Sequence, residues 1–196
     1  MARPREFDTD LALKRAMSVF WAKGYAATSM DDLQRTMQIG RQSLYAAFGD
    51  KRRLYVEALD RYQRDSVAGH LARLRSGASP LAGVEALMVG LIPDDDEVRG
   101  LGCMGVGSVA EFGATDAELV ELRAKSGALL FEALSERLRA GQAAGEIDPA
   151  LDPGLAARFL QATMQGLQLA ARAGADFATL RDLAVFAVER LRPHKP

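Results

Sequence analysis

The sequence contains few of the residues that form disulfides, metal sites or β-sheets. One cysteine, Cys103, and two histidines, His70 and His194, occur among its 196 residues. A single cysteine cannot form an internal disulfide, and so few soft ligands argue against a structural zinc site. The 34 alanines and 26 leucines greatly outnumber the 11 valines, 6 threonines and 3 isoleucines. We therefore predict an all-α protein with no metal and no cofactor.

The sequence also lacks the long apolar segments of membrane and exported proteins. No stretch approaches the roughly 18 uncharged apolar residues that a membrane span needs. No apolar segment of the secretory type follows the first six residues. The length suits one large domain or two small ones with a core of their own. We expect a soluble cytoplasmic protein with no membrane partner, and both histidines on its surface.

Charge is unevenly distributed along the chain. Residues 1–64 carry 12 Lys or Arg against 8 Asp or Glu, whereas residues 65–196 carry 13 against 18. A basic segment joined to an acidic one favours an anionic partner such as nucleic acid for the basic segment alone. A solvated charged face is the alternative explanation.

Apolar residues at helical spacing predict a series of short and then longer helices. The first covers residues 8–23 and ends at Gly24. A second covers residues 30–37, where Ser29 and Asp32 approximate a capping box. A third covers residues 41–47, and a longer helix begins at Lys51 after an N-cap at Asp50.

Five more helices are predicted after these four. They cover residues 80–91, 103–112, 116 to about 142, 153 to about 173, and 176–191, and the acidic residues 94–97 form an exposed loop between the first two. About nine helices result. We divide them into a three-helix domain at residues 1–53 and a helical domain at residues 54–196.

The second and third predicted helices have the spacing of a helix-turn-helix. They are joined by residues 38–40, and the second of the pair begins with Arg41, Gln42 and Ser43. Arginine pairs with guanine, glutamine with adenine, and serine with either base. Lys51, followed by two arginines, begins the next helix, where free N–H groups attract phosphate. This pattern favours DNA binding over an ordinary solvated helical turn.

Three short stretches carry a family resemblance. These are FWAKGYAATSM at residues 20–30, IGRQSLY at 39–45 and FGDK at 48–51. Together they resemble the N-terminal domain of TetR-family transcriptional regulators over about residues 7–62. The resemblance implies a homodimeric repressor of nine or so helices. Its last two helices would form the dimer interface, and its middle helices would enclose a small-molecule pocket.

The resemblance also implies roles for particular residues on double-stranded operator DNA. By analogy, the bases are contacted by Arg41, Gln42 and Ser43. The phosphates are held by Thr28, Tyr45 and Lys51. The sequence departs from the family pattern at two positions, with Gln38 in place of the usual turn glycine and Gly40 in place of the usual Ser or Thr cap.

A second patch, GCMGVGSVAE at residues 102–111, is similar to a Gly-Cys segment in a subset of these regulators, some of which respond to electrophiles or oxidants. Cys103 begins a predicted helix, and a helix N-terminus lowers the pKa of a thiol, so Cys103 could be reactive. The alternative is a small buried hydrophobic residue. The predicted effector-binding residues are Cys103, Met104, Phe131 and Met164.

The last two predicted helices each carry an apolar stripe that suits a four-helix interface between two copies. Packing within one chain is the alternative. The predicted dimer residues are Leu160, Met164, Leu167 and Ala171 on one helix and Leu180, Leu183, Ala187 and Leu191 on the next.

Two other function classes stay open. A small thiol enzyme would use Cys103 as nucleophile, but no histidine lies near it in sequence to act as base. A protein-interaction module would bind an acidic protein surface through its basic N-terminal helices. Our principal interpretation is a regulator, not an enzyme, released from a pseudo-palindromic operator by a small-molecule effector or by modification of Cys103.

Overall fold

A computed structural model describes residues 7–193, which form ten α-helices and no strands. No helix within this range is long and apolar enough to cross a membrane. The helices are α1 Thr9–Lys23, α2 Met30–Met37, α3 Arg41–Phe48, α4 Lys51–Ser76, α5 Pro80–Val89, α6 Asp96–Gly100, α7 Met104–Phe112, α8 Ala117–Ala143, α9 Pro153–Arg172 and α10 Phe177–Glu189.

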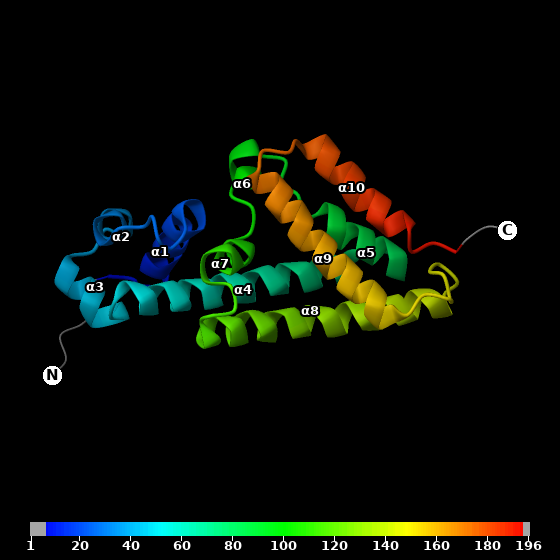
Figure 1. Cartoon of the computed structure of the whole chain (residues 1–196), viewed down its shortest axis with the longest axis horizontal. Helices are drawn as coiled ribbons and strands as arrows, with labels where there is room; N and C mark the ends of the chain where they lie inside the picture. The colour runs from blue at the N-terminus through cyan, green and yellow to red at the C-terminus, as the bar shows by residue number, and fades with distance from the viewer. Residues whose placement is uncertain (1–6, 194–196) are drawn as a thin grey trace.

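The long helices α4 and α8 run side by side along the longest axis of the molecule (Figure 1). Helices α1, α2 and α3 gather at one end of α4, whereas α5, α9 and α10 lie at the other (Figure 1). Each end has its own apolar core. The core at the α1–α3 end includes Phe20 and Leu44, but also Leu59, Met104 and Leu119. This core therefore extends beyond residue 53, and α4 runs without a break across that position.

The predicted helix starts are confirmed by their caps. Ser29 and Asp32 form a complete capping box at α2, and the Asp50 carboxylate accepts a hydrogen bond from the Arg53 amide at 2.8 Å. Asp152 caps α9 ahead of Pro153 in the first turn. The nine predicted helices are all present within a few residues of their expected bounds.

Residues 94–97 are exposed, as predicted, but they are not all loop, because the helix α6 begins at Asp96. The Asp95 carboxylate caps it by accepting a hydrogen bond from the Val98 amide at 2.9 Å. Arg99 is buried and donates to the carbonyl oxygens of Pro93 and Asp94 at 3.1 and 3.0 Å. These hydrogen bonds satisfy backbone groups at the start of α6, and they hold the acidic segment in a single compact turn.

The predicted dimer stripes lie mainly inside the protomer, which corrects that prediction. Leu183 alone among the eight is exposed. The other seven pack in the core formed with α5 and α8, namely Leu160, Met164, Leu167, Ala171, Leu180, Ala187 and Leu191. A side chain already buried in its own protomer has little surface left for a partner. Both helices instead carry a second apolar set on the outside, made of Leu155, Phe159, Leu169, Leu183 and Phe186.

Candidate functional site

The turn between α2 and α3 is built around Gln38. Its φ of 58° and ψ of 40° are left-handed, a conformation that favours glycine and costs another residue about 1 kcal/mol. The Gln38 amide still donates to the Gln34 carbonyl at 3.0 Å, which ends α2. Gly40 then starts α3 without a side-chain cap. The departures from the family pattern are thus accommodated within the turn itself.

Helix α3 presents one polar face to solvent. Leu44 and Phe48 are buried in the core, which leaves Arg41 and Gln42 exposed on the first turn. Ser43 is partly exposed and Tyr45 is 41% exposed. The Arg41 guanidinium lies 5.7 Å from the centre of the Tyr45 ring. These four side chains therefore form a surface of hydrogen-bond donors and acceptors at the tip of the molecule (Figure 1).

Lys51 lies at the N-terminus of α4 beside this surface. Its ammonium nitrogen is 4.3 Å from the centre of the Tyr25 ring, which in turn packs edge-on against Tyr55 at 5.1 Å. The aromatic cluster fixes the position of the cation next to the free N–H groups of α4. Arg52, by contrast, turns away and pairs with Asp116 at 2.7 Å and Glu118 at 2.8 Å.

Thr28 does not fit its predicted role. Its side chain is buried, and its hydroxyl donates to the Gly24 carbonyl at 2.6 Å. The hydroxyl closes the turn before α2, so it is not presented to a phosphate. The neighbouring Ser29 is exposed but serves as the helix cap.

Polar contacts join the α1–α3 unit to α7, to the segment before α7 and to α9. The Glu111 carboxylate accepts from the Tyr25 and Ala26 amides at 2.9 and 2.8 Å. The Trp21 indole donates to the Gly102 carbonyl at 3.1 Å, and Arg172 donates to the Leu101 carbonyl at 2.8 Å and to that of Trp21 at 3.3 Å. These contacts tie the segments at both ends of α7 to α1 and to the turn after it, and the Arg52 pairs tie the start of α4 to the start of α8.

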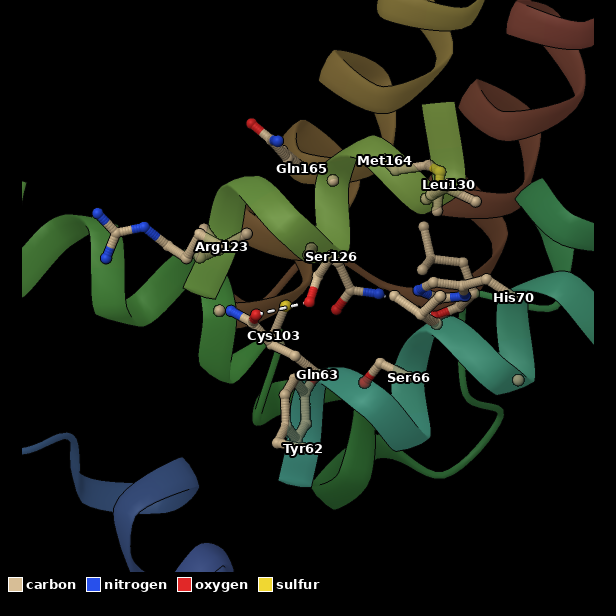
Figure 2. A pocket seen from close by; sticks show the side chains of 18 of the residues that line it. Tyr62, Gln63, Ser66, His70, Cys103, Arg123, Ser126, Leu130, Met164 and Gln165 are labelled. Carbon is tan, nitrogen blue, oxygen red and sulfur yellow. Dashed lines mark hydrogen bonds between the residues drawn. The ribbon is translucent and has the colours of Figure 1, made fainter. Parts of the chain in front are cut away.

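A cavity of about 910 Å³ lies between α1, α4, α7, α8 and α9. Figure 2 shows Gln63 of α4 and Ser126 of α8 facing each other in its middle, joined by a hydrogen bond of 2.8 Å. Much of the lining is apolar, and its volume suits a drug-sized organic molecule. Among the apolar lining residues are Met17, Trp21, Val67, Leu91, Val106, Leu130 and Met164.

Two of the four predicted effector residues line this cavity. Cys103 caps the N-terminus of α7, as predicted, and is partly buried at the cavity wall near Tyr62 (Figure 2). Burial raises the pKa of the Tyr62 phenol, and its interaction with Cys103 adds to the shift. Met164 also lines the cavity.

Met104 and Phe131 lie outside the cavity lining, which corrects their prediction. Met104 is buried in the core of the α1–α3 end. The Phe131 ring packs against the other core and holds the Arg158 guanidinium 4.8 Å from its centre. Their helices are apolar on more than one side, so the sequence pattern could not separate residues that line the cavity from residues of the two cores.

His70 is not the surface residue that we predicted. It lines the cavity, and its Nδ1 atom is buried without a hydrogen-bond partner among the described residues. Burial, assisted by the positive charge of Arg73, lowers the pKa of His70 to about 4. The imidazole is therefore neutral at physiological pH, and no hydrogen bond joins its Nδ1 to the Cys103 thiol. His194 lies outside the described residues.

Several cavity residues escaped the sequence analysis because the cavity is assembled from five helices. Gln63, Ser126 and Arg73 stand in otherwise ordinary amphipathic patterns, and only folding brings them together. No group of three or more potential metal ligands occurs in residues 7–193.

Comparison with known proteins places the chain in a family. Residues 12–58 match the family described as "Bacterial regulatory proteins, tetR family", and residues 84–184 match "Tetracyclin repressor-like, C-terminal domain". The chain belongs to the TetR family. The second match extends this assignment from the helix-turn-helix, where the sequence resemblance lay, to the cavity-bearing part of the fold.

Full-length relatives support the same assignment. The HTH-type transcriptional repressor ComR of Escherichia coli (strain K12) is 33% identical over 186 residues, which cover 93% of this chain and 88% of ComR. The uncharacterized HTH-type transcriptional regulator YezE of Bacillus subtilis (strain 168) is 32% identical over 184 residues, covering 93% of this chain and 95% of YezE.

Solved structures of TetR-family proteins share the fold. A cysteine mutant of the regulator CifR, complexed with 26-bp double-strand operator DNA, superposes with a TM-score of 0.80 at 29% identity, covering 97% of this chain and all of the other. A TetR regulator from Chloroflexus aurantiacus gives the same TM-score at 20% identity over 94% of this chain and 96% of that one, and supports the fold alone. These proteins are regulators, and so the family places this chain among transcriptional regulators.

Proposed function

We propose that the protein is a homodimeric transcriptional repressor that binds double-stranded operator DNA through α3 and is released by a small molecule in the cavity. The observation that carries this proposal is the exposed Arg41, Gln42 and Tyr45 surface of α3, presented by a helix-turn-helix in a TetR-family chain. The operator-bound CifR structure and the repressor ComR support it by similarity. A regulator of this kind acts on the chromosome, so we place it in the cytoplasm.

We assign the base contacts to the first turn of α3, and the phosphate contacts to Tyr45 of α3 and Lys51 of α4. Arg41 and Gln42 extend from the first turn of α3, where they would reach base edges in the major groove. Lys51, held on Tyr25, would bind phosphate together with Tyr45. Ser43 is partly buried and takes a lesser part. Two copies would place their α3 helices on half-sites about 34–36 Å apart.

A salt series with sequence variants tests this division. Arg41→Ala and Gln42→Ala should each cost about 1–3 kcal/mol on the operator and relax preference at particular base pairs. Lys51→Met should weaken binding to every sequence and reduce the salt slope by about one. Arg64→Met, which changes an exposed arginine on α4 paired with Asp60, serves as the matched control. Equal affinity of the wild type for operator and random DNA would refute the proposal.

The outer face of α9 and α10 is our proposed dimer interface. Phe186 is 60% exposed and Leu155 is 69% exposed, on helices that lie at the opposite end of the molecule from α3 (Figure 1). Apolar side chains of this size are enriched in the centres of protein interfaces. Phe186→Asp should yield folded monomers in light scattering, whereas Leu160→Ala should destabilise the protomer by about 2–5 kcal/mol. A dimer unchanged by Phe186→Asp would place the interface elsewhere.

Modification of Cys103 is the second route of release that we propose. The thiol lines the cavity at the N-terminus of α7, whose other end bears Glu111 and its contacts to α1. Alkylation should lower operator affinity in the wild type, and Cys103→Ser should bind DNA without responding. Full alkylation with unchanged affinity would leave Cys103 as a packing residue.

The two other function classes receive less support. A thiol enzyme needs a base joined to Cys103, and the His70 Nδ1 atom in the same cavity has no partner within the described residues. A protein-interaction module would not require the separate base-edge and phosphate surfaces of α3 and α4. We therefore propose that the chain has no catalytic role.

A further inference from the structure

The polar side chains of the cavity differ in whether they have partners inside the protein. Arg123 donates to the Ser108 hydroxyl at 3.0 Å and to the Gly113 carbonyl at 2.6 Å, and Gln161 donates to the Gly127 carbonyl at 2.8 Å. Gln168 donates to the Leu91 carbonyl at 3.0 Å. These groups are occupied in holding the cavity walls together, so they are poorly placed to bind a ligand.

Arg73 and His70 have no such partners. They lie one turn apart on α4, a spacing that sets their Cβ atoms about 5–6 Å apart, and both line the cavity. Within residues 7–193, the Arg73 guanidinium has no hydrogen bond and no acidic partner, and the buried His70 Nδ1 has no partner either. Of the other charged lining residues, Asp65 is paired with Arg61 at 2.9 Å. An unpaired cation and an unsatisfied buried polar atom therefore share one part of the wall.

Two glycines leave room for the Arg73 side chain. A Cβ at Gly90 would lie 2.6 Å from the Arg73 Cδ atom, and one at Gly69 would lie 3.6 Å from its Nη1 atom. The stem is thus packed against the C-terminal end of α5, and the guanidinium lies along α4 toward Gly69, which also lines the cavity. A buried polar atom left without a partner is costly, and a ligand that accepts its hydrogen bond would remove that cost.

We propose that the cavity binds a hydrophobic organic acid whose carboxylate accepts hydrogen bonds from Arg73 and His70, while its apolar body lies against Leu130, Met164 and Leu91. The inference rests on the proposed effector role of the cavity and specifies its chemical class. A guanidinium binds a carboxylate through two parallel N–H donors, and the neutral imidazole supplies a third in its Nδ1–H form. No carboxylate is placed to pair with Arg73 in the described structure, so an anionic head group would complete the site without displacing an existing pair.

Matched pairs of acid and amide test the charge of the head group. The probes are octanoate, decanoate and naphthylacetate, each with its primary amide, and inorganic phosphate as an anion without an apolar body. Dissociation constants are measured by calorimetry on the full-length protein. We expect at least one acid to bind about tenfold or more tighter than its amide, because the amide forfeits the charge-assisted pair, and phosphate alone to bind much more weakly. No binding of any acid below millimolar concentration, or equal binding of acids and amides, would overturn the proposal.

Variants then assign the preference to Arg73. Arg73→Met keeps the stem and removes the charge, so the ratio of acid to amide affinity should fall to about two or less, whereas Arg73→Lys should restore part of it. Arg64→Met, on the same helix but outside the lining, should leave the ratio unchanged. If Arg73 merely stabilises the end of α5, Arg73→Met would lower the melting temperature of the free protein and leave the ratio intact, which refutes the proposal.

Operator binding in the same samples separates this inference from the proposed function. Acid binding that depends on Arg73 supports the ligand class even if the operator stays bound, and in that case the effector role fails. Specific operator binding together with no preference for acids leaves the repressor proposal standing and overturns the ligand class.

Discussion

The contact between Gly24 and Glu111 gives a quantitative test of how α7 is joined to the α1–α2 turn. Gly24 has a φ of 79° and a ψ of 175°, a region that is essentially restricted to glycine. A Cβ added there would lie 2.6 Å from the Glu111 Oε1 atom, and that oxygen also accepts the Tyr25 amide. Gly24→Ala should therefore strain the backbone and also displace the carboxylate.

The two effects have separable magnitudes. Backbone strain at such a position costs about 1–3 kcal/mol. The two hydrogen bonds to Glu111 are exposed, so we assign them about 1–2 kcal/mol together. When Glu111→Ala is already present, no carboxylate remains to be displaced, and Gly24→Ala costs the strain alone. The double variant should then be more stable than the sum of the single effects predicts, by about 1–2 kcal/mol.

Urea denaturation of the wild type, both single variants and the double variant measures this coupling. Each 1 kcal/mol corresponds to about 2–4 °C in the melting temperature for a chain of this size. Gly145 provides the control because it has a φ of 72° and open space around its Cβ position. Gly145→Ala should be strained but additive with Glu111→Ala. Additivity of Gly24→Ala and Glu111→Ala within about 0.5 kcal/mol would show that the carboxylate does not hold the turn.

Two further predictions concern single residues. Gln38→Gly should raise the free energy of unfolding by about 0.5–1 kcal/mol, because glycine adopts the left-handed turn without a Cβ penalty; a loss of stability in urea denaturation would contradict this. His70 should titrate near pH 4 by NMR, and the free energy of unfolding should decrease as pH falls from 6.5 to 4, because the unfolded chain takes up a proton that folded His70 does not. His70→Gln should flatten this part of the pH profile, and an NMR pKa near 6.5 would contradict the burial of the imidazole.

The helix-turn-helix could be predicted almost completely from the sequence. Caps such as Ser29 and Asp50 act through backbone groups within three residues of themselves, so their signals are local. Leu44 and Phe48 are buried, so they define the face of α3 that packs in the core. Arg41 lies off that face and is therefore exposed to solvent.

The remaining features depend on tertiary contacts that no local pattern encodes. Leu160 and Phe159 are adjacent on α9, yet one packs in the core and the other is 45% exposed, because α9 is apolar on two sides. Helical periodicity alone could not decide which side faces a partner. His70 lines the cavity together with residues of α8 and α9, which are distant from it in sequence. Thr28 is buried in the turn before α2, where its hydroxyl binds the Gly24 carbonyl.

The continuity of α4 has a mechanical consequence for the release from DNA that we propose. A helix of 26 residues is about 39 Å long, with Lys51 at one end and the cavity residues His70 and Arg73 near the other. Because such a helix is stiff, a rotation of about 5° around its far end would displace Lys51 by about 3.4 Å, which equals the axial rise of one base pair. A ligand that wedges α4 away from α8 by a small angle would therefore shift each half of the dimer by a whole step along the DNA, without any change inside the helix-turn-helix itself.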